Sequence, residues 1–258
     1  RRASSIRKRR SASSSTGWSF KATLFAGTNI ITVYCTNAVG DVGSDSVTNY
    51  PPSAANSILT FTFDELKAIC DEAHKLHRSV AAHAVGRDGI ENALRAGVNT
   101  IEHGDGCDDE MIALAGEKEA YWCPTLFVTE YVAEGRAAEG RPIYRQMINH
   151  QREAFLKGVK AGMKIALGTD AGGFAWDINE AVELTAMVNA GMTPFQAISA
   201  ATAVGADLLG MGGKLGEIIP GASADIIAVK GDPLSEISRL EHIRFVMKEG
   251  KVVRNDAR

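Results

Sequence analysis

The segments Val80–His83 (VAAH), Thr100–His103 (TIEH) and Leu167–Asp170 (LGTD) share one pattern. Each is a short apolar run, typical of a β-strand, that ends on a side chain able to bind a divalent metal, and Gly-containing sequence comes directly after it. In a (β/α) barrel, the side chains that end parallel strands lie where the βα loops build the active site. The sequence therefore predicts an α/β fold that carries His83, His103 and Asp170 as metal ligands at one edge of a parallel sheet.

Helical patterns alternate with these strands. A capping box at Thr62–Glu65 opens the first helix. The sequence then predicts strand 79–83, helix 88–96, strand 98–102, helix 108–118, strand 120–127, helix 141–161, strand 164–169, helix 177–190 and helix 194–203. Four βα units in a row predict a parallel sheet with crossover helices. Short strands at 216–221, 224–229, 244–247 and 251–254 predict a small antiparallel appendage.

Composition narrows the class of partner. The 28 basic and 31 acidic residues of this 258-residue chain give a formal net charge of −3, so no nucleic-acid partner is expected. The basic run at the start of the chain, residues 1–16, is interpreted as a disordered tail. No apolar run approaches a membrane span and no signal-peptide pattern is present, so no membrane partner is expected and the compartment stays open. The four cysteines lack CxxC spacing and are expected to be free thiols.

The segment 17–56 differs in composition from the rest of the chain. Residues 18–24 alternate and residues 29–34 are β-branched, which is typical of short strands. The stretch Gly27–Gly40 fits the pattern GxNxITVxxxNxxG. It resembles the last strands of a bacterial immunoglobulin-like module, and a Pro51-Pro52 linker comes after it. We expect only part of such a module here, because the sandwich normally needs about seven strands.

From about residue 58 the motifs resemble a known enzyme family. The stretches DEAHKLHRSVAAHAVG, AGVNTIEHGDG, LGTDAGG, GMTPFQAISAATAVGADLLGM and LGEIIPGASADIIAVKGDPL are similar to the amidohydrolase superfamily, in its imidazolonepropionase-like and Xaa-Pro dipeptidase branch. The resemblance implies the C-terminal half of a (β/α)8 TIM barrel (strands 5 to 8) over 57–204. It also implies part of a small β-sandwich domain over 205–258. By position, His83 and His103 would end its fifth and sixth strands, and Asp170 its eighth.

The sequence also departs from that family. The resemblance implies a His-x-His pair on the first strand and a bridging Lys on the fourth, yet no His-x-His occurs in these 258 residues. His74 and His77 are spaced i, i+3 on a predicted helix instead. We therefore expect an incomplete copy that is inactive as an isolated chain.

The predicted chemistry is metal-dependent hydrolysis of a carbon–nitrogen bond. Neutral imidazoles of His83 and His103 suit a divalent metal, zinc above all, and Asp170 would act as general base. A small-molecule amide or dipeptide is the expected substrate. Phe174 and Trp176, just after Asp170, either line the substrate pocket or pack beneath their own loop.

Two other functions stay open. The chain could be a non-catalytic fragment that acts through protein interactions, with self-association through exposed barrel edges. Alternatively, the immunoglobulin-like start could make it an extracellular binding module. An intact His-x-His pair upstream in the gene would favour the enzyme, whereas a complete seven-strand module there would favour the binding module.

Overall fold

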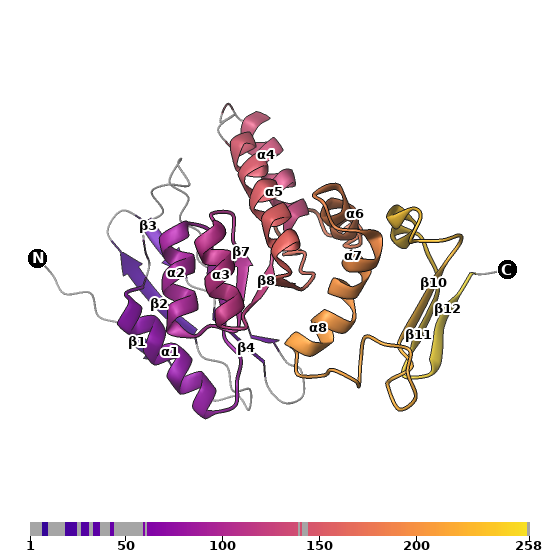
Figure 1. Cartoon of the computed structure of the whole chain (residues 1–258), viewed down its shortest axis with the longest axis horizontal. Coiled ribbons are helices and arrows are strands. Elements are labelled where there is room, and N and C mark those ends of the chain that lie inside the picture. Colours follow the sequence, from indigo (N-terminus) through magenta and orange to yellow (C-terminus); the bar gives the residue numbers. More distant parts are fainter. Residues whose placement is uncertain are drawn as a thin grey trace, which may run out of the picture. The chain divides into compact units, whose positions relative to one another are not determined.

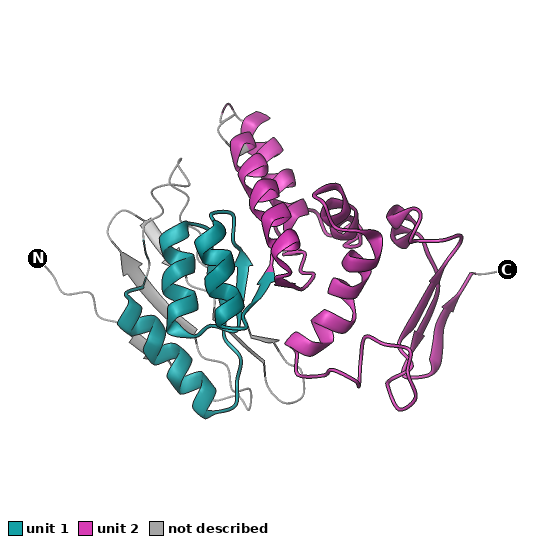
Figure 2. Ribbon diagram, in the orientation of Figure 1, with its two compact units in different colours: residues 1–122 teal, residues 123–258 magenta. Residues whose placement is uncertain are grey.

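The computed structural model describes Leu59, residues 61–138, Gly140 and residues 144–256. Two compact units divide the chain, Arg1–Trp122 and Cys123–Arg258 (Figure 2). Before Leu59, only backbone is assigned, as five short strands: β1 (Arg7–Arg9), β2 (Ser19–Leu24), β3 (Gly27–Ile30), β4 (Val33–Thr36) and β5 (Val42–Gly43). Apart from the backbone of these five strands, the predicted basic tail and immunoglobulin-like segment lie outside the described residues, and both stay predictions.

In the first unit, strands and helices alternate as the sequence predicts. The elements are α1 (Phe63–Lys75), β6 (Ala81–Ala84), α2 (Arg87–Ala96), β7 (Thr100–His103), α3 (Asp109–Glu117) and β8 (Tyr121–Cys123). The three helices lie side by side (Figure 1). Strands β6 and β7 pair in parallel, β8 is next to β7 in the sheet, and β6 also pairs antiparallel with the backbone of β4. The predicted α/β fold with a parallel sheet and crossover helices is confirmed.

Local signals set these helix boundaries. The Thr62 side chain accepts a hydrogen bond from the Glu65 N–H and the Glu65 carboxylate accepts one from the Thr62 N–H, which completes the capping box. Helix α2 ends at Gly97, whose φ of +100° is the left-handed conformation that favours glycine. The Asp108 carboxylate accepts from the Met111 N–H at 2.9 Å and caps α3.

The core of the first unit lies between its helices and its sheet. Ile90 and Leu94 of α2 are fully buried, as are Ile101 of β7 and Trp122 of β8. Burial of each such side chain contributes roughly 1.5–3 kcal/mol of stability relative to exposure. This packing holds the strand ends that carry the two histidines.

The second unit begins with helices and ends with a small sheet. Its elements are α4 (Leu126–Ala138), α5 (Tyr144–Ala161), β9 (Lys164–Ile165), α6 (Val182–Asn189), α7 (Pro194–Ala201), α8 (Ala203–Leu208), β10 (Ile226–Val229), η2 (Ile237–Glu241), β11 (Ile243–Lys248) and β12 (Lys251–Asn255). The strand order β10-β11-β12 is antiparallel, as predicted for the appendage. No described helix is long and apolar enough to cross a membrane.

Several predicted elements after residue 119 differ from the structure. Strand 120–127 ends at Cys123, and the unpredicted helix α4 begins at Leu126. Pro124 cannot donate to a sheet ladder and Thr125 has a φ of +49°, so the chain turns between them. Strand 164–169 pairs only at Lys164–Ile165, and the predicted helix at 177–190 starts at Val182.

The segment 216–221, predicted to be a strand, forms bends at 216–217 and a turn at 220–221, and contains no strand. Gly216 and Gly221 have φ values of +79° and +91°, outside the extended region. A Cβ on Gly216 would lie 2.5 Å from the Thr202 carbonyl oxygen, so this backbone passes close to the end of α7. Over the described residues, the strands do not close into a barrel.

Candidate metal site

The two histidines predicted as ligands lie against each other. His83 is in β6 and His103 is the last residue of the neighbouring parallel strand β7. Their imidazole centroids are 4.3 Å apart, with an interplanar angle of 66°. The structure therefore brings this predicted pair together within one unit.

A regular strand would not produce this contact. In the register of β6 and β7, His83 is level with Glu102 and Ala84 is level with His103. Successive side chains of a strand point to opposite faces, so an extended His103 would point away from His83. His103 instead has a φ of +69°, a left-handed conformation that is uncommon outside glycine. This local departure from the strand accounts for how its ring reaches His83.

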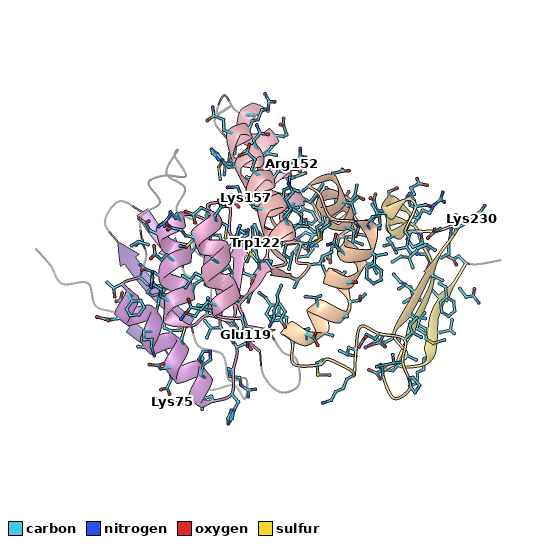
Figure 3. The ribbon with its side chains drawn as sticks, viewed as in Figure 1. Lys75, Glu119, Trp122, Arg152, Lys157 and Lys230 are labelled. Carbon is cyan, nitrogen blue, oxygen red and sulfur yellow. The ribbon has the colours of Figure 1, made fainter. Side chains whose placement is uncertain are left out.

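The turn at His103 is held by Trp122, a fully buried residue labelled in Figure 3. The Trp122 Nε1–H donates a hydrogen bond to the His103 carbonyl oxygen at 2.8 Å. The Gly104 N–H donates to the Ala84 carbonyl oxygen at 3.1 Å. Gly104 has a φ of +67°, and a Cβ there would lie 2.4 Å from Trp122 Nε1. Only glycine fits both the conformation and the close approach of the indole.

Burial keeps both imidazoles neutral. It lowers the pKa of His83 below its ordinary value. Burial, with a smaller effect of the His83 ring, lowers the pKa of His103 to about 3. A neutral imidazole carries the free lone pair that a metal ligand needs, so the protonation states of the pair suit a cation.

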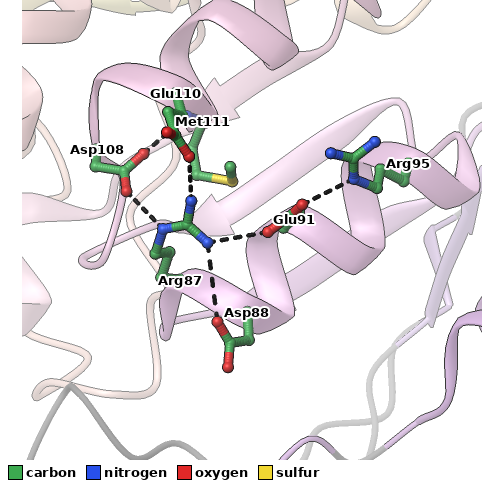
Figure 4. Close-up of polar contacts among 7 residues, drawn as sticks. All are labelled: Arg87, Asp88, Glu91, Arg95, Asp108, Glu110 and Met111. Atoms are coloured by element: carbon green, nitrogen blue, oxygen red, sulfur yellow. Dashed lines mark hydrogen bonds and ion pairs between the residues drawn. The ribbon is translucent and has the colours of Figure 1, made fainter.

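Arg87 ties together the loops that come after the two histidines (Figure 4). Its guanidinium Nε donates to Asp108 at 2.7 Å, Nη1 donates to Glu91 at 2.9 Å, and Nη2 donates to Glu110. Arg87 opens α2 after β6, whereas Asp108 and Glu110 lie at the start of α3 after β7. In addition, the Gly106 N–H donates to the Val85 carbonyl oxygen at 2.8 Å. The two βα loops that follow the histidine strands are thereby linked to each other.

Asp170 belongs to the second unit. Its φ is +52°, and its carbonyl oxygen accepts a hydrogen bond from the Gly173 N–H at 2.9 Å. The residue is exposed to solvent, while partial burial of its carboxyl group raises the pKa above the ordinary value. Within the described ranges, no group of three or more His, Cys, Asp or Glu side chains forms a metal-holding cluster. The three-residue ligand set therefore remains a prediction.

The two aromatic residues after Asp170 have different environments. Phe174 is buried and packs edge-on against Phe127, with ring centroids 5.1 Å apart. Trp176 is 81% exposed. Phe174 therefore packs beneath the loop, which is one of the two alternatives that the sequence leaves open.

Sequence reasoning did not identify Trp122, Gly104 or Arg87. Trp122 lies in an apolar run that predicts core, and nothing in the run shows that its indole N–H serves a turn 19 residues away. Arg87 directly follows the first histidine loop, and Asp108 follows the second. That placement was the available signal for a link between the two loops.

Comparisons with known proteins agree with the fold. Residues 39–253 match the model of the amidohydrolase family. The chain is 34% identical over 203 residues to ochratoxinase of Aspergillus niger, covering 74% of this chain and 41% of that protein. A crystal structure of a Xaa-Pro dipeptidase with bound methionine superposes with a TM-score of 0.73 at 36% identity, over 79% of this chain and 52% of that one. A putative prolidase from Bifidobacterium longum gives a TM-score of 0.73 at 31% identity, over 82% and 55% of the two chains.

This chain thus spans about half the length of the relatives that it matches. The family match covers most of the chain and includes both histidine strands, Asp170 and the C-terminal sheet. Its first residues, from 39, fall within the segment predicted to be immunoglobulin-like. The resemblance of the sequence motifs is confirmed, and the chain belongs to the amidohydrolase family.

Proposed function

We propose that this chain supplies His83, His103 and Asp170 to the metal site of a hydrolase that cleaves a carbon–nitrogen bond. The observation that carries the proposal is the contact of the His83 and His103 rings on adjacent parallel strands, with ring centroids 4.3 Å apart. Members of the amidohydrolase family typically use a divalent metal. Two neutral nitrogen donors fit zinc among the first-row divalent ions.

Each residue has a separate role in the proposed reaction. A divalent cation, when bound, supplies Lewis-acid activation of water and of the scissile carbonyl group. His83 and His103 would hold that cation, and burial, which lowers the pKa of both rings, favours the unprotonated form that a ligand needs. Asp170 accepts a proton from the attacking water and passes it to the leaving nitrogen.

The substrate proposed is a small-molecule amide or a dipeptide. The matched structures include a Xaa-Pro dipeptidase and a putative prolidase, and a curated relative is an ochratoxinase. We also propose that turnover requires metal ligands that this chain does not contain, because it has no His-x-His pair. On that proposal, the chain alone hydrolyses neither dipeptides nor N-acyl amino acids above background.

Complementation tests this function. The chain is mixed with a separately produced first half of a complete relative, and Xaa-Pro dipeptide cleavage is followed with zinc present. We expect turnover only in the mixture, with loss in Asp170→Asn and retention in the matched control Asp177→Asn, an exposed residue of the same loop. Asp170-dependent turnover by the unsupplemented chain would contradict the need for further ligands. A mixture that neither binds zinc through the histidines nor turns over would favour the non-catalytic interpretation.

A further inference from the structure

Glu183 is a buried carboxylate that the proposed reaction does not use. It lies in α6 and is 0% exposed. Its Oε1 accepts from the Leu126 N–H and its Oε2 from the Phe127 N–H, both at 2.8 Å. These are the first two residues of α4. The first N–H groups of a helix have no partner within the helix, and a carboxylate there also interacts favourably with the helix dipole. Glu183 thus caps α4 from a helix more than fifty residues away in sequence.

A second buried side chain holds the turn before α4. The Gln151 Nε2 donates to the Pro124 carbonyl oxygen at 2.7 Å, and Gln151 is 1% exposed. Between the two anchored ends lies Thr125, which is 3% exposed and has a φ of +49°. A threonine in this conformation persists only where its surroundings impose it. Here those surroundings are side chains of α5 and α6.

The start of α4 is also the packing surface for the turn that contains Asp170. The Phe127 ring packs edge-on against Phe174. A Cβ on Gly173 would lie 2.5 Å from Val128 Cγ2, so this backbone rests directly on the first turn of α4. The Gly173 N–H in turn donates to the Asp170 carbonyl oxygen. Where α4 begins therefore determines where the residues 170–174 can lie.

We propose that Glu183 is a positioning residue for Asp170: by capping α4, it fixes the surface on which the Asp170–Phe174 turn packs. The inference deepens the proposed function and rests on it, because Asp170 is the proposed base. It assigns a role to a residue that touches neither substrate nor metal. It also links the Asp170 turn to the protonation of a buried group.

The surroundings of Glu183 shift the pKa of its carboxyl group toward neutral pH, where its protonation can be followed. The pKa of Glu183 is raised to about 7, mainly by burial. The two N–H donors lower this pKa, and the nearby charge of Glu130 in α4 raises it. Glu130 is itself paired with Arg152 of α5 at 2.6 Å. Elements η2 and α7 also pack against α6. The charged residues of η2 are Arg239 and Glu241, and α7 contains no charged residue. A protonated carboxyl has one oxygen converted to a hydroxyl, so one of the two N–H groups loses its strong acceptor.

The test uses nuclear magnetic resonance of the metal-free chain. Amide exchange of Leu126 and Phe127 reports the cap, and the chemical shifts of Gly173 report the Asp170 turn. We expect roughly ten-fold faster exchange at the cap in Glu183→Gln, with shifted Gly173 resonances. The exposed Glu180→Gln, which removes the same charge just before α6, is the control and should change neither. In the wild-type chain, the amide exchange at the cap, corrected for intrinsic exchange, and the Gly173 shifts should change together as the pH falls from 8 to 6. In Glu183→Gln, neither should change with pH over this range.

The outcomes separate the alternative roles. If the cap signals respond while Gly173 does not, Glu183 stabilises α4 without positioning Asp170, and the inference is wrong. A uniform loss of protection across the second unit, without a transition near neutral pH, would also overturn it. The wild-type pH titration alone decides the matter if Glu183→Gln fails to fold. Because no metal or substrate is present, failure of the proposed hydrolysis would leave this result standing.

Discussion

The indole N–H of Trp122 donates a hydrogen bond to the carbonyl oxygen of His103, at 2.8 Å. This bond holds the residue whose left-handed backbone turns its ring toward His83, and the indole is wholly buried. The geometry of the proposed metal site therefore depends on a residue outside the ligand set.

Trp122→Phe should weaken zinc binding by about ten-fold, because loss of a buried hydrogen bond costs on the order of 1–2 kcal/mol and lets the His103 turn relax. Isothermal calorimetry of the folded variant measures this, with a melting curve to confirm folding. Trp176→Phe changes an indole that is 81% exposed and should bind zinc as the wild type does. Equal zinc affinity in all three proteins would show that Trp122 does not position His103 for metal binding.

Gly104→Ala should destabilise the chain by about 1–3 kcal/mol, because a side chain is strained at a φ of +67° and its Cβ would lie 2.4 Å from Trp122 Nε1. Chemical unfolding gives the free-energy difference. The matched control is Gly116→Ala in α3, where a Cβ would meet nothing within 4 Å. This substitution should stabilise the helix by up to about 1 kcal/mol. Similar effects at the two glycines would show that the turn at Gly104 tolerates a side chain.

Glu183 gives a pH dependence of stability with a defined sign. Its pKa is about 7 in the folded chain and its ordinary value is 4.5, so the folded state binds this proton more tightly. The resulting stability is fully present below pH 4.5 and is lost as the pH rises through about 7. The free energy of unfolding of the wild type relative to Glu183→Gln should therefore increase on acidification, by up to about 3 kcal/mol. Urea unfolding of both proteins from pH 8 to pH 5 measures the slope, and parallel curves would contradict a Glu183 carboxyl that titrates near neutrality.

Arg87→Gln should lower the melting temperature, since it leaves Asp108, Glu91 and Glu110 close together without their shared cation. The loss should shrink at high salt, because these groups are partly exposed and their repulsion is screened. Arg95→Gln is the control, as Arg95 pairs with Glu91 inside α2 and does not bridge two loops. A larger effect at Arg95 than at Arg87 would argue against the loop link.

The sequence predicted the first unit well because its boundaries are set by short-range signals. The Thr62–Glu65 capping box, Gly97 and Asp108 each act within a few residues, and the structure begins or ends a helix at each. The strands that carry His83 and His103 were predicted from short apolar runs, and the structure forms them at Ala81–Ala84 and Thr100–His103.

The errors lie where distant side chains decide the conformation. Residues 120–127 have strand composition, yet the turn at Pro124 depends on Gln151 and Glu183, which no local pattern reveals. The turn at His103 likewise depends on Trp122. The sequence therefore identified the candidate ligands, and only the structure showed what holds them.

His83 and His103 are proposed to act together as metal ligands. Zinc titration of the 15N-labelled chain, read through the imidazole nitrogens of all six histidines, tests whether they do. We expect His83 and His103 to shift together with one midpoint, and we expect the chain purified without chelator to hold less than one equivalent of zinc. Exposed His150 should stay unchanged at that midpoint. If zinc shifts other histidines while His83 and His103 stay unchanged, the proposed site is wrong. If the chain holds two tightly bound equivalents of zinc and loses both in His83→Ala, the metal site is complete within this chain.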